Sequence, residues 1–371
     1  MDLMAILHAA AKHGASDIHI VVGKPPMVRI DGELTSMGKE VLDATECERL
    51  VYAILNAKQK SQFEETQELD CSIGVDGLGR FRVNALQHKN GMGAVLRVIQ
   101  GNPPNPEDIG LSEPIIRLSE LPRGLILVTG PTGSGKSTTL AALIERLNRT
   151  KRHHILTVED PIEFVYESQL SVITQREVST HTQSFAAALK SALRQDPDVI
   201  LVGEMRDLET IALAISAAET GHLVFATLHT TDAAQTVDRI VDVFPAYQQE
   251  QIRMQLSTGL RGVICQQLLK KKGGGRIAAR EILIVNPAVA NLIREGKTHQ
   301  IYSAVELGRK FGMQSLDRHL AELVLHRKVE LDEAVAKAND PKNFKMILEG
   351  LVAQAQAEAA EQGGGRRGRR R

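Results

Sequence analysis

The sequence predicts an α/β protein with two domains: an α+β domain built on an antiparallel sheet, then a larger domain in which strands and helices alternate. Two observations carry this prediction. Short strand-like runs separated by turn residues fill most of the first hundred positions. From about residue 112, short apolar runs alternate with helical stretches, which is typical of a parallel sheet covered by helices. The length of 371 residues also exceeds that of a typical single domain.

We expect the first domain to span residues 1–100. The residue pair Asn90-Gly91 is a turn signal between the last two of its predicted strands. The pair Asp31-Gly32 lies between two extended runs and predicts a hairpin. The elements expected in this domain are helices over Leu3–Lys12 and Thr45–Leu55, and strands over Ser16–Val22, Met27–Ile30, Glu33–Leu34, Leu69–Gly74, Arg80–Gln87 and Ala94–Ile99.

A proline-rich segment, Gly101–Pro106, is the clearest break in the sequence. Prolines at positions 103, 104 and 106 cannot continue a helix or a central strand. We therefore expect an interdomain linker at residues 101–111. A flexible linker here would let the two domains rotate against each other.

The second domain is expected over residues 112–355. Its short apolar runs have the composition of strands that are buried on both faces, as in a doubly wound sheet. Residues 356–371 end in glycine and arginine and predict a flexible tail. The expected elements are strands over Leu125–Val128, Ile155–Val158, Val199–Val202 and Leu223–Ala226, helices over Thr138–Asn148 and Phe185–Arg194, a hairpin over Ile264–Leu269 and Arg276–Ile284, and mostly helix from Pro287.

The segment Gly130–Ser137 reads GPTGSGKS and matches the phosphate-binding pattern GxxxxGK[ST] in full. It follows a predicted strand and opens a predicted helix, which is the context that the motif requires. Its glycines let backbone N–H groups surround phosphates, and the helix N-terminus adds positive potential. A chance glycine-rich turn would rarely satisfy every fixed position. The predicted phosphate-binding residues are Gly130, Pro131, Thr132, Gly133, Ser134, Gly135, Lys136, Ser137 and Thr138.

Carboxylates follow two other predicted strands. Glu204 ends the run VILVGE, where a P-loop enzyme needs an acid to hold Mg²⁺ or to orient the attacking water. Glu159, Asp160 and Glu163 follow the strand over Ile155–Val158, at the edge where ligands bind in such sheets. Solvated loop acids remain the alternative for each. The predicted Mg²⁺ ligands are Ser137, Glu159, Asp160 and Glu204.

Two histidines, His222 and His229, flank the apolar run LVFATL and should lie at its opposite ends. Either is a candidate to sense a phosphate or to position Glu204, although a histidine at a strand end is more often structural or solvated. A zinc site is not indicated, because no third ligand lies at zinc spacing.

Taken in order, GPTGSGKST, TVEDPIEF, DVILVGEMRD and GHLVFATLHTTDA resemble the Walker A, Asp box, Walker B and His box of the secretion and pilus motor ATPases. The resemblance implies a PAS-like N-terminal domain joined to a RecA-like P-loop ATPase domain, assembled as a homo-hexamer that uses ATP and Mg²⁺. It also implies that Glu204 and Lys136 are catalytic, and that Glu163 and His229 complete the site. In this family, arginines of the N-terminal domain reach the nucleotide of an adjacent subunit. Arg82 and Arg97, which we expect on neighbouring strands, are the candidates for this role.

Within the family, three features favour the branch that retracts type IV pili over motors for pilus assembly or type II secretion. About 100 residues precede the ATPase domain, where assembly motors carry more. The cysteines Cys47, Cys71 and Cys265 are too few and too scattered for the zinc motif of those relatives. The segment Ala288–Glu295, AVANLIRE, resembles a motif of the retraction branch and departs from it at Val289 and Ala290. The resemblance implies a pilus platform protein of the inner membrane as partner.

Composition bears on the remaining classes. Lys+Arg and Asp+Glu are equal at 45 each and aromatic residues make up 3%, which argues against a nucleic-acid translocase, although the run Arg366–Arg371 is basic. A basic tail can equally touch anionic lipid. An ATP-binding regulator without turnover is disfavoured by Lys136 and Glu204. No apolar run approaches the ~18 residues of a membrane span, and Asp2 replaces the positive charge of a signal peptide. We expect a cytoplasmic protein at the inner-membrane base of the pilus.

Overall fold

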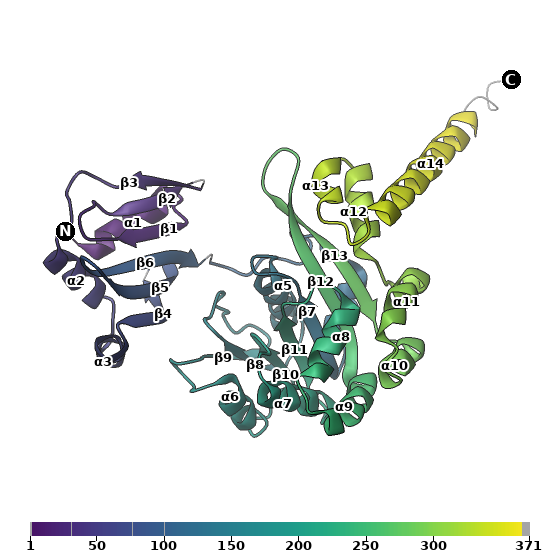
Figure 1. Cartoon of the computed structure of the whole chain (residues 1–371), viewed down its shortest axis with the longest axis horizontal. Coiled ribbons are helices and arrows are strands. Elements are labelled where there is room, and N and C mark those ends of the chain that lie inside the picture. Colours follow the sequence, from purple (N-terminus) through teal and green to yellow (C-terminus); the bar gives the residue numbers. More distant parts are fainter. Residues whose placement is uncertain (1, 31, 76, 100, 366–371) are drawn as a thin grey trace. The chain divides into compact units, whose positions relative to one another are not determined.

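The computed structural model describes residues 2–30, 32–75, 77–99 and 101–365 (Figure 1). The chain forms two compact units. The first contains Met1–Asn102 together with Asp160–Tyr166 and Arg176–Gln183. The second contains Pro103–Glu159, Glu167–Gln175 and the chain from Ser184 onward. Two segments of the predicted ATPase region therefore pack with the N-terminal unit.

The N-terminal unit is built on an antiparallel sheet, as predicted, and its strand order is β3-β2-β1-β6-β5-β4. Along β5, Phe81, Val83 and Ala85 are fully buried, whereas the residues between them lie on the other face. Helix α1 packs Leu7 against the same core. The elements are α1 (Leu3–Lys12), β1 (Asp17–Ile20), β2 (Met27–Ile30), β3 (Glu33–Ser36), α2 (Ala44–Tyr52), α3 (Ala57–Thr66), β4 (Glu68–Val75), β5 (Gly79–His88) and β6 (Gly91–Ile99).

The larger unit is built on a mixed sheet with strand order β13-β12-β7-β11-β10-β8-β9. The pairs from β12 through β8 are parallel, and β13 is antiparallel to β12. Every residue of β7 and β11 is buried, because helices cover both faces of the sheet. The strands are β7 (Gly124–Thr129), β8 (His154–Glu159), β9 (Val172–Glu177), β10 (Val199–Val202), β11 (Leu223–Leu228), β12 (Leu260–Lys270) and β13 (Arg276–Ile284).

The helices of the larger unit alternate with the strands and then continue to the end of the described chain (Figure 1). Apolar side chains of α7, α8, α9, α10 and α11 share one core with the sheet. The bounds are α4 (Glu113–Ser119), α5 (Lys136–Thr150), α6 (Phe185–Ala192), α7 (Leu208–Glu219), α8 (Ala233–Asp242), α9 (Ala246–Gly259), α10 (Pro287–Arg294), α11 (Ile301–Leu307), α12 (Leu316–Leu325), α13 (Leu331–Val335) and α14 (Pro341–Gly365).

Two differences from the prediction concern the ends of elements. Helix α14 continues to Gly365, past residue 356, where the sequence predicts that a flexible tail begins. The arginine run Arg366–Arg371 lies outside the described residues. Strand β12 begins at Leu260, four residues before the predicted hairpin, because its first residues pair with β7. No helix in the described ranges is long and apolar enough to cross a membrane.

The strand register brings four loops to one edge of the sheet. Leu228 pairs with Thr129, Ala226 with Val202, and Val202 with Val158, so the carboxyl ends of β7, β11, β10 and β8 lie in a row. Parallel strands present their following loops at the same edge. The predicted phosphate loop, His229, Glu204 and Glu159 all begin there.

Candidate active site

The phosphate loop runs from the end of β7 to the start of α5, and its backbone requires glycine. Gly133 and Gly135 have φ of 77° and 87°, in the left-handed region. A Cβ atom at Gly130 would lie 2.2 Å from the Gln266 carbonyl oxygen. No side chain caps the N-terminus of α5, which starts at Lys136. Its first backbone N–H groups therefore stay available for an anion.

A residue outside every nucleotide motif fixes this loop. Gln266, in the middle of β12, is 1% exposed. Its Nε2 donates to the Ser134 carbonyl oxygen at 2.8 Å, and its Oε1 accepts from the Thr139 hydroxyl at 2.8 Å. One amide thus joins the loop to the first turn of α5. Sequence reasoning missed Gln266, because no local signal connects positions 134 and 266.

Lys136 is held by the loop that contains it. Its Nζ donates to the carbonyl oxygens of Gly130 at 2.8 Å and Pro131 at 3.2 Å. The ammonium group is therefore fixed beside the glycine turns of the phosphate loop. This is the position from which a lysine can compensate phosphate charge.

Glu204 lies two residues beyond β10 and is held by Arg206 and His229. Its Oε1 is 2.6 Å from Arg206 Nε and 2.9 Å from His229 Nε2. Burial alone would raise the pKa of Glu204, but the Arg206 hydrogen bond and charge, and then His229, lower it below its ordinary value. Glu204 is therefore ionised at neutral pH. Arg206, which sequence reasoning did not single out, is the stronger of these partners.

Only one of the two candidate histidines adjoins Glu204. His229 follows β11 at the carboxyl edge of the sheet, 2.9 Å from Glu204. His222 precedes β11 at the opposite edge, where its Nδ1 lies 2.9 Å from the Ala217 carbonyl oxygen. The predicted placement at opposite ends is confirmed, and geometry favours His229 as the partner of Glu204.

The acids that follow β8 divide between the two compact units. Glu159 ends β8 in the larger unit, where it accepts hydrogen bonds from Thr157 at 2.6 Å and Gln175 at 3.2 Å. Asp160 and the exposed Glu163 belong to the unit that contains the N-terminal sheet. Among the described residues, no three His, Cys, Asp or Glu side chains gather as a metal site. A bound Mg²⁺ would therefore need oxygen ligands from phosphate and water as well.

The candidate arginines of the N-terminal unit lie directly opposite each other. Arg82 on β5 pairs in register with Arg97 on β6. Arg97 Nε donates to Asp17 Oδ1 at 2.8 Å, and its side chain is 68% exposed. The Arg82 side chain makes no hydrogen bond or ion pair within the described chain. Like charges directly across a pair of strands are unfavourable, so folding alone does not explain this arrangement.

The family model described as "Type II/IV secretion system protein" matches residues 1–336. The chain belongs to this family. The resemblance of its four motifs to the secretion and pilus ATPases is thereby confirmed, and so is the predicted α/β fold class with a P-loop domain. The type II/IV secretion family accounts for both compact units, since the match begins at the first residue.

Relatives within the type II/IV secretion family are similar over nearly the whole chain. The chain is 54% identical to the type IV pilus retraction ATPase PilT of Pseudomonas aeruginosa, over 93% of this chain and 100% of that protein. It is 50% identical to a twitching motility protein of Neisseria gonorrhoeae, over 86% of each. The crystal structure of the pilus retraction motor PilT with bound ADP superposes with a TM-score of 0.87 at 46% identity, covering 92% of this chain and 98% of that one.

Proposed function

We propose that this chain is an ATP-hydrolysing motor that powers the retraction of type IV pili and works as a ring of six copies. The observation that carries the proposal is the row of loops at one sheet edge, which sets a glycine-lined phosphate loop beside the paired Glu204 and His229. The 54% identity to a retraction ATPase over that protein's full length supports the direction of the motor.

The site supports hydrolysis of the γ-phosphate by water. Backbone N–H groups of the phosphate loop and the Lys136 ammonium group bind the phosphates and offset their charge. Glu204, kept ionised by Arg206 and His229, orients the attacking water and accepts a proton from it. The water oxygen then bonds to the γ-phosphorus while the bond to the leaving oxygen of ADP breaks.

The residues at this edge suit Mg²⁺. The Ser137 hydroxyl, in the first turn of α5, makes no hydrogen bond within the described chain. Glu159 and Glu204 supply carboxylate oxygens at the same edge of the sheet. Mg²⁺ prefers such hard oxygen ligands and keeps several waters. When bound, the ion neutralises charge on the phosphate oxygens. Ser137 would be its ligand from the protein, with Glu159 and Glu204 acting directly or through water.

We further propose that Arg82 or Arg97 completes the nucleotide site of a neighbouring copy. Support comes from the unfavourable pairing of two arginines and from the lack of a partner for Arg82 among the described residues. An arginine supplied from a neighbour stabilises charge on the transferred phosphoryl group. Glu163 and Asp160, in the same compact unit, are proposed to act with it.

Mixed rings test this proposal. Rings of Arg82→Ala subunits or of Lys136→Ala subunits alone should have little ATPase activity. Mixed rings should recover part of it, because the intact phosphate loop of one subunit meets the intact arginine of the other. Assembly of each mixture is checked by size-exclusion chromatography with light scattering. Absence of recovery at every ratio of assembled rings would exclude action across the interface for Arg82, and the same test then applies to Arg97.

The direction of the motor is tested in cells of the native host. We expect a strain that carries Lys136→Ala to have more surface pili than its parent and to lose twitching motility, because fibres still assemble and no longer retract. Fewer or no pili would instead indicate an assembly motor. The proposal places the protein on the cytoplasmic side of the inner membrane, at a platform protein of the pilus base.

A further inference from the structure

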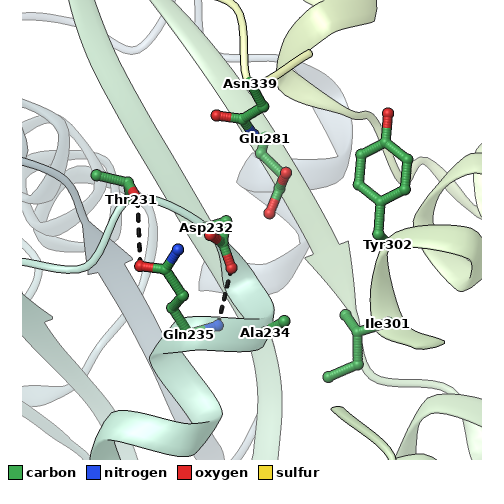
Figure 2. Close-up of a pocket in the computed structure, with 8 residues that line it drawn as sticks. All are labelled: Thr231, Asp232, Ala234, Gln235, Glu281, Ile301, Tyr302 and Asn339. Atoms are coloured by element: carbon green, nitrogen blue, oxygen red, sulfur yellow. Dashed lines mark hydrogen bonds between the residues drawn. The ribbon is translucent and has the colours of Figure 1, made fainter. Parts of the chain in front are cut away.

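A cavity of ≈ 350 Å³ lies within the larger unit, and no residue of the phosphate loop lines it. Elements far apart in the sequence line it: the N-terminus of α8, strand β13, the start of α11 and the segment before α14 (Figure 2). Its volume is at the lower end of the range of small-ligand sites. Its lining residues include Asp232, Glu281, Tyr302 and Asn339.

The buried acid of this cavity is Glu281, which is 3% exposed. Its Oε1 accepts the backbone N–H of Ala233, the first residue of α8, at 2.8 Å. Its other oxygen has no hydrogen-bond partner within the described chain. Figure 2 shows this carboxylate pointing into the space between Asp232 and the ring of Tyr302. The Glu281 side chain is largely removed from water and this oxygen receives no donor from the described chain, so a ligand in the cavity could donate a hydrogen bond to it.

The charges around Glu281 are of one sign. Burial raises the pKa of Glu281 most. Against the hydrogen bond from Ala233, the nearby carboxylates Asp232, Asp317 and Glu306 raise it further, to about 7. One of them, Glu306, has a buried Oε1 without a hydrogen-bond partner among the described residues. The titratable groups that face Glu281 are Asp232 of α8, Tyr302 and Glu306 of α11, Asp317 of α12 and, across the strand pair, Cys265 of β12.

The remaining lining residues suit a flat cation that donates several hydrogen bonds. Carboxylates accept the paired N–H groups of a guanidinium, the Tyr302 ring offers a face for stacking, and the Asn339 amide adds an acceptor. A compact metal ion fits less well, since no three suitable ligands gather among the described residues. We propose that this cavity is a binding site for an arginine side chain that a protein partner presents.

An arginine bound here would act close to the catalytic pair. Glu281 holds the first residue of α8, and the loop before this helix begins at His229, the partner of Glu204. The start of α11 also lines the cavity, and α11 follows the segment that resembles the retraction motif. The effect of a bound arginine on Glu204 rests on the proposed function. The binding of arginine to the cavity does not depend on that function.

The chain contains no tryptophan, so one can be introduced as a reporter. Tyr302→Trp keeps an aromatic ring in the cavity and gives up the hydrogen bond between Tyr302 and Asn343. The matched control is Tyr247→Trp, on α9, whose tyrosine is 82% exposed. The probe is acetyl-arginine amide, and acetyl-citrulline amide has the same shape without the charge. Fluorescence of the full-length chain is measured against probe concentration between pH 6 and pH 8, without any readout of ATP turnover.

We expect saturable binding of the arginine probe to Tyr302→Trp and no saturation with Tyr247→Trp. Affinity should rise about tenfold from pH 6 to pH 8, because the ionised fraction of a group with a pKa of about 7 rises by that factor. Added to the reporter, Glu281→Gln should lower the affinity at pH 8 at least tenfold and remove the pH dependence, whereas the exposed Glu250→Gln should change neither. Equal binding of the citrulline probe, or affinity independent of Glu281, would overturn the proposal. Isothermal titration of the unmodified chain with both probes gives the same decision without a new side chain.

Discussion

Two carboxylates of the larger unit, Glu204 and Glu281, have opposite electrostatic environments. Burial acts on both in the same direction and raises their pKa values. Arg206 and His229 both contact the Glu204 carboxylate and lower its pKa below the ordinary value. Glu281 has a single backbone N–H and otherwise carboxylates, so its pKa rises to about 7. Depth in the fold and the partners of each acid together therefore decide its charge.

This difference assigns the two acids to different tasks. An acid that stays ionised across the physiological range can serve as a base or orient water in every catalytic cycle. An acid that is half protonated near neutral pH responds to small changes around it, such as the arrival of a cation. Three experiments test this contrast.

The largest effect is expected from Glu204→Gln. Glutamine keeps the size of the side chain and removes the negative charge, so ATP binding should persist while kcat falls by about 10²–10⁴-fold. Nucleotide binding and steady-state ATPase rates measure the two effects separately. A kcat within a few-fold of the parent would remove Glu204 from the catalytic role and end its contrast with Glu281.

An intermediate effect is expected on stability from Glu281→Gln. The pKa of Glu281 is raised from 4.5 to about 7 on folding, so the folded state binds the proton more tightly than the unfolded chain. Its contribution to the unfolding free energy therefore falls as pH rises from 4.5 to 7, by about 3 kcal/mol in total. Glutamine cannot ionise, so the unfolding free energy of the variant should not decrease in this way as pH rises.

Urea unfolding of parent and variant at a fixed protein concentration, between pH 4 and pH 8, measures this difference. The variant should gain relative to the parent as pH rises through this window. The exposed Glu250→Gln serves as the control and should follow the parent at every pH. If the difference between Glu281→Gln and the parent stays constant with pH, Glu281 is not the titrating group.

The smallest effect is expected from Arg206→Ala, and only at acidic pH. Removing the strongest partner lets burial raise the pKa of Glu204, so its ionised form is lost at a higher pH than in the parent. The acid limb of the kcat profile should move to higher pH while the rate at pH 8 changes little. Arg206→Lys keeps a positive charge and should move the limb less. An unchanged acid limb would mean that Arg206 does not set the charge of Glu204.

Much of the fold and of the catalytic edge could be predicted, because the signals are local. The glycine pattern before Lys136 dictates the phosphate loop by its backbone conformation, and apolar runs that end in Glu159, Glu204 and His229 place these residues at one sheet edge. The antiparallel first sheet followed from alternation and turn residues such as Asn90-Gly91. The roles of Arg82, Arg97 and Glu163 remain predictions.

What escaped prediction depends on contacts distant in sequence. Gln266 meets the phosphate loop across more than a hundred residues, and Glu281 acquires its pKa from burial and from acids of three separate segments. Both residues lie in strands whose apolar pattern predicts only that the strands are buried, and that pattern gives no role to a single polar residue within them. The end of α14 escaped for another reason: three glycines at 363–365 disfavour a helix, yet α14 continues through them.

The amide of Gln266 has a consequence for sequence variation across the family. It donates to the Ser134 carbonyl oxygen and accepts from the Thr139 hydroxyl at the same time. A glutamate of equal length would set an accepting oxygen against the Ser134 carbonyl oxygen in place of the donating amide nitrogen, and an asparagine would fall one methylene short. Neither substitution preserves both bonds. A chain that keeps the glycine pattern but carries another residue at this position of β12 should therefore hold its phosphate loop less firmly.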